Sequence, residues 1–166
     1  MALKSFEEFG NITQQIAESS IRIYQGNMAA KIMQEVAHFT PVDRGYAKGN
    51  WEVDVNDDTV TPSNDRDRTK TGIRAKRKAL KKLQSFMTSG GVNPSQSSKS
   101  AGSDDAIYIK NGVVGIARKD GKYKESEGKG YIIKLDEGKS EQSPFGMVYP
   151  TLARIDHLSK QALRGK

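Results

Sequence analysis

Residues 40–51 (TPVDRGYAKGNW) mark a change from helical to strand periodicity, and this change constrains the fold more than any other feature of the sequence. Pro41 disfavours helical backbone at Thr40, and Gly45 and Gly49 supply backbone freedom that helices lack. Apolar residues recur every three or four positions before this segment and every two positions after it. The chain therefore turns from helix to sheet here.

The segment before residue 40 predicts one long amphipathic helix. Ser5 followed by Glu8 forms a capping box, which places the helix start at Ser5. The apolar positions form two stripes that are out of phase: Phe6, Phe9, Ile12 and Ile16, then Met28, Ile32, Val36 and Phe39. The phase change predicts either a bend near Gly26 or a helix that touches two different partners. An unbroken helix to Phe39 would be roughly 50 Å long, so its early half is expected to pack on a neighbouring subunit.

The next segments predict a strand, a loop and a second helix. Trp51, Val53 and Val55 alternate with polar residues, which is the pattern of a strand with one buried face, and we expect the single Trp in the core. Residues 56–67 predict an exposed loop. Residues 66–87 favour a helix, and its apolar positions are Ile73, Leu80, Leu83 and Met87.

Residues 66–82 are strongly basic. The cationic side chains are Arg66, Arg68, Lys70, Arg74, Lys76, Arg77, Lys78, Lys81 and Lys82. The whole chain carries 27 Lys and Arg against 20 Asp and Glu, a formal charge of +7, which suggests a polyanionic partner but also occurs in ordinary soluble proteins. Two interpretations stay open: a solvated helix on a sheet, or a helix whose basic face meets nucleic-acid phosphates without reading sequence. Aromatic residues do not interleave with the basic ones, so no platform for stacking bases is indicated.

A polar segment and a turn signal follow the basic helix. Residues 89–105 are rich in Ser and Gly and predict a flexible loop. Asn111 and Gly112 lie between the apolar runs 106–109 and 112–117. Asn-Gly between apolar runs predicts a β-hairpin, because both residues tolerate positive φ.

The C-terminal region predicts short elements and a closing helix. Residues 118–129 form a charged loop, and residues 131–135 form a strand or a short helix. Residues 147–149 predict an edge strand. Pro150 opens a last helix that runs to Leu163, because proline suits the first position of a helix. The apolar positions of this helix, which can cover the sheet, are Leu152, Ile155, Leu158 and Ala162.

The sequence carries no recognisable catalytic or metal-binding constellation. Cysteine is absent, which excludes disulfides and thiolate sites. The two histidines, His38 and His157, are expected to be structural or exposed. The acidic pairs 57–58, 104–105 and 136–137 are interpreted as turn and solvation residues. We therefore expect no enzyme activity and no cofactor, and a small hydrolase that uses Asp or Glu is only a minor hypothesis. Apolar runs are too short to cross a membrane, which predicts a soluble intracellular protein.

Two separated motifs resemble those of a known family. The first, TPVD-x-G followed by Trp, is matched by Thr40, Pro41, Val42, Asp43, Gly45 and Trp51. The second, L-E-x-G-x-S-x-Q-x-P-x-G-M-V, is matched by Leu135, Asp136, Gly138, Ser140, Gln142, Pro144, Gly146, Met147 and Val148. With both motifs in this order, the chain resembles the tail-completion or neck proteins of tailed bacteriophages, a family that is similar to minor tail protein Z of phage lambda.

The resemblance implies a structural virion protein. It implies one α+β domain over residues 1–166, with a mixed or antiparallel sheet flanked by a long N-terminal helix, a basic middle helix and a C-terminal helix. The chain is then expected to assemble in the host cytoplasm into a closed ring, most often a hexamer, around the double-stranded DNA passage. Its neighbours would be the head connector and the tail terminator or tail tube proteins.

Ring closure requires two different matching surfaces on each subunit. The expected positioning or interface residues are Pro41, Asp43, Gly45, Trp51, Gly138, Ser140, Gln142, Pro144 and Gly146. The basic helix is the expected DNA-facing or partner-facing surface. The alternative hypothesis is a monomeric or dimeric protein that binds nucleic acid non-specifically through residues 66–82.

Overall fold

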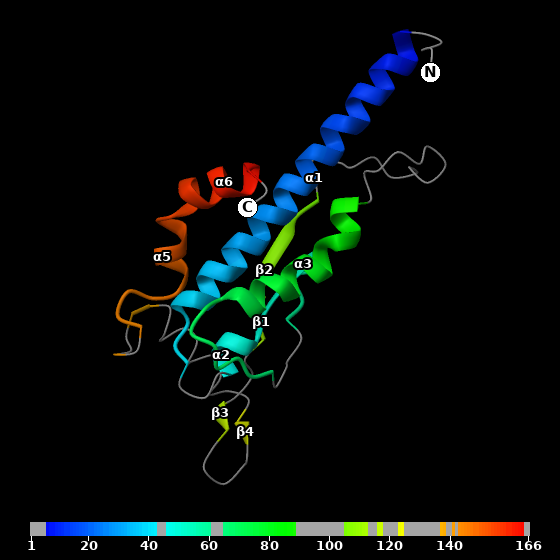
Figure 1. Ribbon diagram of the computed structural model, residues 1–166. Helices are drawn as coiled ribbons and strands as arrows, with labels where there is room; N and C mark the ends of the chain where they lie inside the picture. The colour runs from blue at the N-terminus through cyan, green and yellow to red at the C-terminus, as the bar shows by residue number, and fades with distance from the viewer. Residues whose placement is uncertain are drawn as a thin grey trace.

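The protein has an α+β fold built around one long helix (Figure 1). The computed structural model describes residues 6–42, 46–60, 65–88, 105–112, 116–117, 123–124, 137–138, 141 and 143–164. In chain order, the elements are α1 (Phe6–Phe39), α2 (Tyr46–Gly49), β1 (Trp51–Val55), α3 (Ile73–Thr88), β2 (Ile107–Asn111), β3 (Ile116–Ala117), β4 (Tyr123–Lys124), α5 (Val148–Leu152) and α6 (Ile155–Leu163). The predicted fold class is confirmed, and the sheet that α1 and α3 flank is antiparallel.

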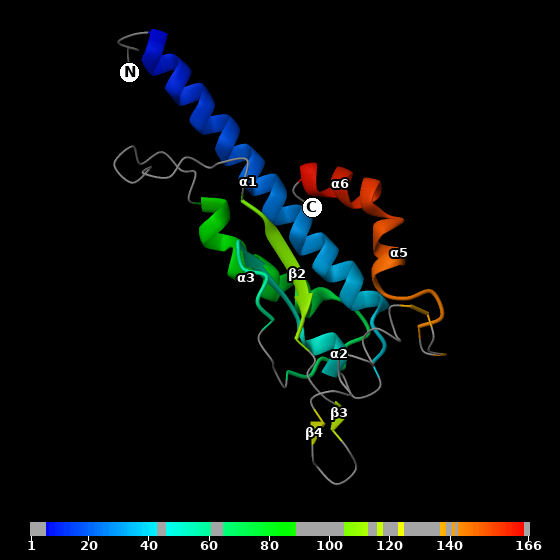
Figure 2. The same cartoon turned by 180° about the vertical axis from the view of Figure 1, so that it is seen from behind.

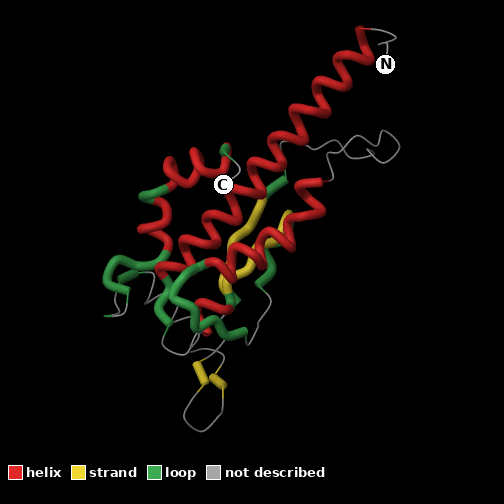
Figure 3. Tube along the Cα trace, viewed as in Figure 1, coloured by secondary structure: helices red, strands yellow, loops and turns green. Residues whose placement is uncertain are grey.

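Helix α1 is the central element of the fold. Its C-terminal half has α3 and the β1–β2 sheet on one side, and α5 and α6 on the other (Figures 1 and 2). Figure 3 shows that helices make up most of the described chain and that the longer strands lie beside α3. The N-terminal half of α1 extends well past all of these elements (Figure 1).

Helix α1 runs without a break, so the predicted bend near Gly26 is wrong. Gly26 is buried, and a Cβ there would overlap the side chain of Met87 on α3. The glycine therefore permits the close approach of two helices. The alternative prediction, that the two stripes meet different partners, stays a prediction, because Phe6, Phe9, Ile12 and Ile16 of the first stripe are exposed in the single chain. The predicted start at Ser5 lies outside the described residues.

Small side chains let α1 and α3 pack closely around a shared core. The buried apolar residues of this core are Ala29, Ala30, Met33, Val36 and Ala37 on α1, Ala47 on α2, Trp51 and Val53 on β1, Ala75, Ala79 and Leu83 on α3, and Met147 before α5. Trp51 therefore lies in the core, as predicted. Ile73, which was expected to face the core, is exposed because α3 turns its alanines inward instead.

Strands β1 and β2 form a two-stranded antiparallel sheet with one apolar and one polar face. The register runs from Trp51 opposite Asn111 to Val55 opposite Ile107. Val53 is fully buried, and Val55 and Ile107 pack against the core, so this face meets the helices. The other face carries charged side chains from both strands.

The predicted hairpin around Asn111 and Gly112 is wrong. β2 pairs with β1 and β3 pairs with β4, so the runs 106–109 and 112–117 are not paired with each other in the described sheets. The Gly112 N–H donates to the Asn50 carbonyl at 2.9 Å, so Asn-Gly marks the place where β2 leaves β1. The long-range pairing prevails because it lets the apolar residues of β2 cover the core.

Helix α3 begins at Ile73, later than the predicted start at residue 66. The Asp67 carboxylate accepts hydrogen bonds from the N–H and the hydroxyl of Thr69, at 2.8 and 2.7 Å. A side chain that bonds nearby backbone in this way competes with helix formation. The polar turn therefore delays the helix.

The C-terminal region differs from its prediction in two respects. Residues 147–149 do not form an edge strand, because helix α5 begins at Val148. Two short helices replace the single helix expected from Pro150 onward. Leu158 and Ala162 of α6 are buried, and α6 packs on α1 instead of covering the sheet.

Three predicted segments are described only in part or not at all. β4 lies within residues 118–129, so the expectation of a loop is wrong there. Of the predicted loop at residues 89–105, only Asp105 is described, and residues 131–135 lie outside the described ranges. The flexible loop and the single-domain organisation stay predictions.

Candidate functional site

The basic residues between positions 66 and 82 do not share one helical face. Arg66, Arg68 and Lys70 lie in the irregular segment before α3, and the others lie on α3 itself. The predicted basic helix is therefore shorter than the basic segment.

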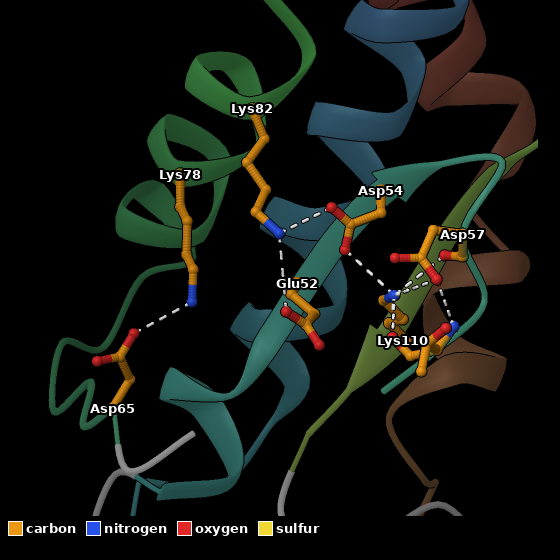
Figure 4. Close-up of polar contacts among 8 residues, drawn as sticks. Glu52, Asp54, Asp57, Asp65, Lys78, Lys82 and Lys110 are labelled. Carbon is orange, nitrogen blue, oxygen red and sulfur yellow. Dashed lines mark hydrogen bonds and ion pairs between the residues drawn. The ribbon is translucent and has the colours of Figure 1, made fainter. Parts of the chain in front are cut away.

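Two lysines of α3 are engaged in ion pairs within the chain (Figure 4). The Lys82 ammonium lies 2.8 Å from a carboxylate oxygen of Asp54 and 3.8 Å from one of Glu52, both on β1. The Lys78 ammonium lies 3.1 Å from the Asp65 carboxylate. These pairs tie α3 to its neighbours, and they neutralise charge that an anionic partner would otherwise meet.

Lys110 on β2 completes this network on the polar face of the sheet (Figure 4). Its ammonium lies 3.2 Å from the Asp54 carboxylate and 3.9 Å from that of Asp57. It also donates to the carbonyl oxygens of Asp57 and Thr59, so the loop after β1 folds over it. Lys110 is buried, and its charge has the partners that burial requires.

The network lowers the pKa values of two aspartates. Burial alone would raise the pKa of Asp54, but hydrogen bonds from Lys82 and Lys110 outweigh it and hold the pKa below its usual value. Hydrogen bonds from the hydroxyl and N–H of Thr59 lower the pKa of Asp57. Both carboxylates are therefore ionised at neutral pH and hold the lysines in place.

Four other basic residues have exposed side chains. They are Arg68 and Lys70 before α3, and Arg77 and Lys81 on its outer surface. None of the four has an ion-pair partner among the described residues. They are the cations most accessible to an anionic ligand.

Arg74 and Lys76 have local roles instead. The Arg74 guanidinium donates to the Arg66 carbonyl at 3.0 Å, which supports the turn before α3. Lys76 lies beside Lys31 of α1, and burial together with this like charge lowers the pKa of Lys31. Arg74 is exposed but makes this local bond, and Lys76 is half-buried.

The first motif joins the end of α1 to the start of β1. The Trp51 indole N–H donates to the Thr40 hydroxyl at 2.8 Å, and that hydroxyl donates to the Val36 carbonyl at 2.6 Å. Thr40 and Trp51 are both buried. The two ends of the motif therefore form a structural joint.

Lys48 of α2 is a buried cation next to this joint. Its side chain is 1% exposed, and its ammonium has no hydrogen-bond partner in the described part of the chain. Burial lowers the pKa of Lys48, and the charge of Asp67 acts in the opposite direction. The cavity that Lys48 lines has a volume of about 20 Å³, which suits about one water molecule and no larger ligand.

The described residues of the second motif, Gly138 and residues 143–148, lie against one another near the end of α1. Gly138 and Gly146 have φ values of +69° and +75°, a region that favours glycine. A Cβ on Gly138 would lie 2.6 Å from the Pro144 carbonyl oxygen. The Ser143 hydroxyl donates to the Gly146 carbonyl at 2.8 Å, and Met147 then enters the core. Because Trp51 belongs to the same core, the two motifs are linked.

A surface cavity of about 630 Å³, the aromatic cavity, lies where the end of α1 meets the second motif. It is lined by Phe39, Glu137, Gly138, Ser143, Pro144, Phe145, Gly146, Tyr149 and Pro150. Phe145 is 80% exposed and Tyr149 is 74% exposed. Since pockets that bind ligands usually enclose about 300–1,000 Å³ and are mainly apolar, this cavity is a candidate binding surface.

The projecting half of α1, residues 6–23, exposes large apolar side chains. They are Phe6, Phe9, Ile12, Ile16, Ile21 and Ile23, and Phe6 is 97% exposed. Near the end of the projecting half, the Arg22 guanidinium lies 3.3 Å from the Asp105 carboxylate and 5.3 Å from the centre of the Phe86 ring. An apolar surface of this extent marks an interaction site.

Four of the predicted interface residues and the two histidines complete the comparison with the sequence predictions. Asp43, Gly45, Ser140 and Gln142 lie outside the described residues, so their predicted roles stay predictions. Both histidines are exposed, in agreement with their expected role.

Sequence reasoning missed two features of the site. It did not predict the acidic residues that pair with the lysines of α3, and it did not predict the aromatic cavity. Glu52 alternates with apolar residues and is expected in solvent, yet it is only 8% exposed, and its carboxylate lies 3.8 Å from the Lys82 ammonium of α3. The sequence does contain one usable signal for the cavity. Phe145 lies between Pro144 and Gly146 in an otherwise polar turn, and an aromatic residue there has no core to fill.

In the ranges that the structure describes, no group of three or more His, Asp or Glu side chains is arranged to hold a metal ion. No helix in these ranges is both long enough and apolar enough to span a bilayer. Comparison of the chain with protein-family models, with curated proteins and with solved structures yields no match. The candidate surfaces are therefore the basis for inferring a function.

Proposed function

We propose that the chain is a structural subunit of the neck of a tailed bacteriophage, which assembles as a ring around the DNA passage between the head connector and the tail. One observation carries the proposal: the projecting half of α1 exposes a row of large apolar side chains beyond the rest of the described fold. Such a helix needs a second chain to cover it. The motif resemblance favours the neck as the assembly that supplies this chain.

The two motifs support the proposal through their positions. Thr40 and Trp51 form the joint at the end of α1, and the second motif builds the aromatic cavity beside it. The chain therefore carries two unlike surfaces for contact, the exposed apolar helix and the cavity. A cyclic ring requires unlike surfaces of this kind, whereas a two-fold dimer requires one surface that matches itself.

Electron microscopy of isolated phage-like particles tests this role. An antibody against the chain should label the junction between head and tail, and particles assembled without the chain should contain heads and tails that are not joined. Normal joining without the chain, or labelling at another place in the particle, would contradict the proposal.

The exposed cations Arg68, Lys70, Arg77 and Lys81 favour one other function, non-specific binding of nucleic acid by the single subunit. In this case the logarithm of the affinity for double-stranded DNA should fall with the logarithm of salt concentration by about 0.9 per phosphate contact. The R77Q/K81Q variant should reduce this slope. The matched variant K78Q/K82Q should reduce it less, because both of its lysines are engaged in ion pairs.

The neck function and the nucleic-acid-binding function predict different results in this binding experiment. A neck subunit should bind DNA weakly until a ring multiplies the contacts. Tight, salt-sensitive binding by the monomer, together with absence from particles, would replace the neck proposal.

A further inference from the structure

We propose that the tip of α1, formed by Phe6 and Phe9, docks into the aromatic cavity of a second copy of this chain. The inference rests on the proposed ring, and it identifies the two surfaces that would join neighbouring subunits. One surface is a protruding pair of aromatic side chains, and the other is a cavity lined by Phe145 and Tyr149.

The tip cannot fill the cavity of its own copy. Phe6 is the first residue of α1, and Phe39, which lines the cavity, is the last. At about 1.5 Å per residue, the two lie about 50 Å apart. Figure 1 shows helix α5 beside the C-terminal half of α1, far from the N-terminus of that helix. A head-to-tail contact between two copies therefore covers the tip of one copy and the cavity of the other. The remaining tip and the remaining cavity stay free to bind further copies and close a ring.

The side-chain directions at the tip suit insertion. With 3.6 residues per turn, Phe6 and Phe9 point about 60° apart, whereas Glu7 and Glu8 each point about 130° from the middle of that pair. The aromatic rings can therefore enter an apolar cavity while both carboxylates stay in water. This arrangement matters because Glu137 lines the cavity and would repel a second carboxylate.

The contact can extend along both helices. The exposed stripe Phe9, Ile12, Ile16 and Ile23 is turned by about 90° from the buried face of α1 that meets α3. Helix α3 of the same copy therefore cannot cover this stripe. On the receiving side, Leu152 lies almost one turn of α5 after Tyr149 and is 53% exposed, so the apolar surface continues beyond the cavity.

Cross-linking between introduced cysteines tests the contact, because the native chain has no cysteine to react. The F6C/F145C variant is treated with a short bismaleimide, both as concentrated purified protein and in isolated particles. A head-to-tail contact should give a ladder of dimers, trimers and larger species. The matched control F6C/I73C keeps the tip and moves the second cysteine to an exposed position on α3, so it should give no ladder.

Three results would overturn the contact: no F6C/F145C ladder in either preparation, an equal ladder from F6C/I73C, or efficient dimers from F6C alone. The last result would mean that tips pair with each other. A labelled neck without the ladder would leave the ring role standing and reject only this contact. A ladder from a protein that is absent from the neck would reject only the neck role.

Removing the aromatic side chains gives a second readout. The F6S/F9S variant should weaken self-association at least about tenfold in sedimentation velocity, because each buried ring contributes a substantial apolar area. The control I73S changes an exposed apolar residue on α3, outside both proposed contact surfaces, and it should leave association unchanged. Circular dichroism should show unchanged helix content in both variants, since all three side chains are exposed. An equal effect of the two variants would overturn the proposal.

Discussion

Thr40 connects two parts of the fold through one hydroxyl, which accepts from the Trp51 indole and donates to the Val36 carbonyl. Thr40→Val keeps the shape of the side chain but leaves the buried indole N–H without its acceptor. The free energy of unfolding should fall by roughly 1–3 kcal/mol. Chemical denaturation measures this loss.

Thr13 provides a matched control, because its hydroxyl donates to the Phe9 carbonyl in the same local pattern on an exposed surface. Thr13→Val should change the free energy of unfolding by less than about 0.5 kcal/mol. If both variants lost the same amount, the bond to the indole would contribute nothing.

Replacing Lys48 is expected to stabilise the protein, whereas replacing Thr40 should destabilise it. Its ammonium is buried without a hydrogen-bond partner in the described residues, so Lys48→Met should raise the free energy of unfolding by about 1 kcal/mol or more. The control Lys81→Met changes an exposed lysine and should have little effect. A clear loss of stability in Lys48→Met, measured by thermal denaturation, would mean that the ammonium is satisfied in solution.

Between elements, the ion pairs of Asp54 link α3 to the sheet and make stability depend on pH. The pKa of Asp54 is lowered in the folded chain, so its contribution is fully present above the unfolded pKa of about 4 and is lost as pH falls through the folded value. The free energy of unfolding should therefore decrease as the solution is acidified below about pH 5.

Asp54→Asn isolates this contribution. The variant should be less stable than the native chain at neutral pH, and its free energy of unfolding should change less on acidification. The control Asp58→Asn alters an exposed aspartate with no ion pair among the described residues, so it should keep the native dependence. Equal acid sensitivity in the native and Asp54→Asn chains would contradict the assignment.

Gly72 sets the distance between α1 and α3. A Cβ on Gly72 would overlap the Gln34 carbonyl of α1, so Gly72→Ala should lower the free energy of unfolding by roughly 1–3 kcal/mol. Gly10→Ala is the control, because nothing lies within 4 Å of a Cβ at that helical position. There alanine should stabilise the protein by roughly 0.5–1 kcal/mol. Urea denaturation of the pair checks the sign of each effect.

Local patterns predict the elements of this fold better than their partners. The spacing of apolar residues identifies α1, β1 and most of α3, because each period reflects one buried face. Asn111 and Gly112 show the limit: the turn signal is strong, but β2 gains more by pairing with a strand far back in the chain. The start of α3 was predicted too early because the turn at Asp67 competes with the helix.

The candidate sites are also only partly predicted by local sequence patterns, because they depend on which elements pack together. Composition identifies the basic segment, but the pairing of Lys82 with Asp54 becomes visible only when α3 lies beside β1. The aromatic cavity joins Phe39 to Phe145, which are distant in the sequence, so no local pattern contains it. The projecting half of α1 is an exception, because its length alone predicted a surface that the chain does not bury.

For the whole molecule, the formal charge of +7 separates two kinds of association by their response to salt. Self-association through the apolar tip should persist or strengthen in ammonium sulfate, which favours burial of apolar surface. Binding to DNA should weaken instead, because salt reduces the gain from counterion release. Sedimentation velocity over a series of salt concentrations measures both kinds of association. Dissociation of the oligomers as the salt concentration rises would contradict an apolar contact.

The unbroken course of α1 also has a mechanical consequence. Its first residue belongs to the tip and its last residue lines the aromatic cavity, so one stiff rod spans the molecule between these two surfaces. A push or twist applied at one end reaches the other as a rigid-body movement, because no hinge interrupts the helix. If subunits are joined tip to cavity, each helix α1 connects two contacts of the ring, and strain at one contact is shared around the whole circle.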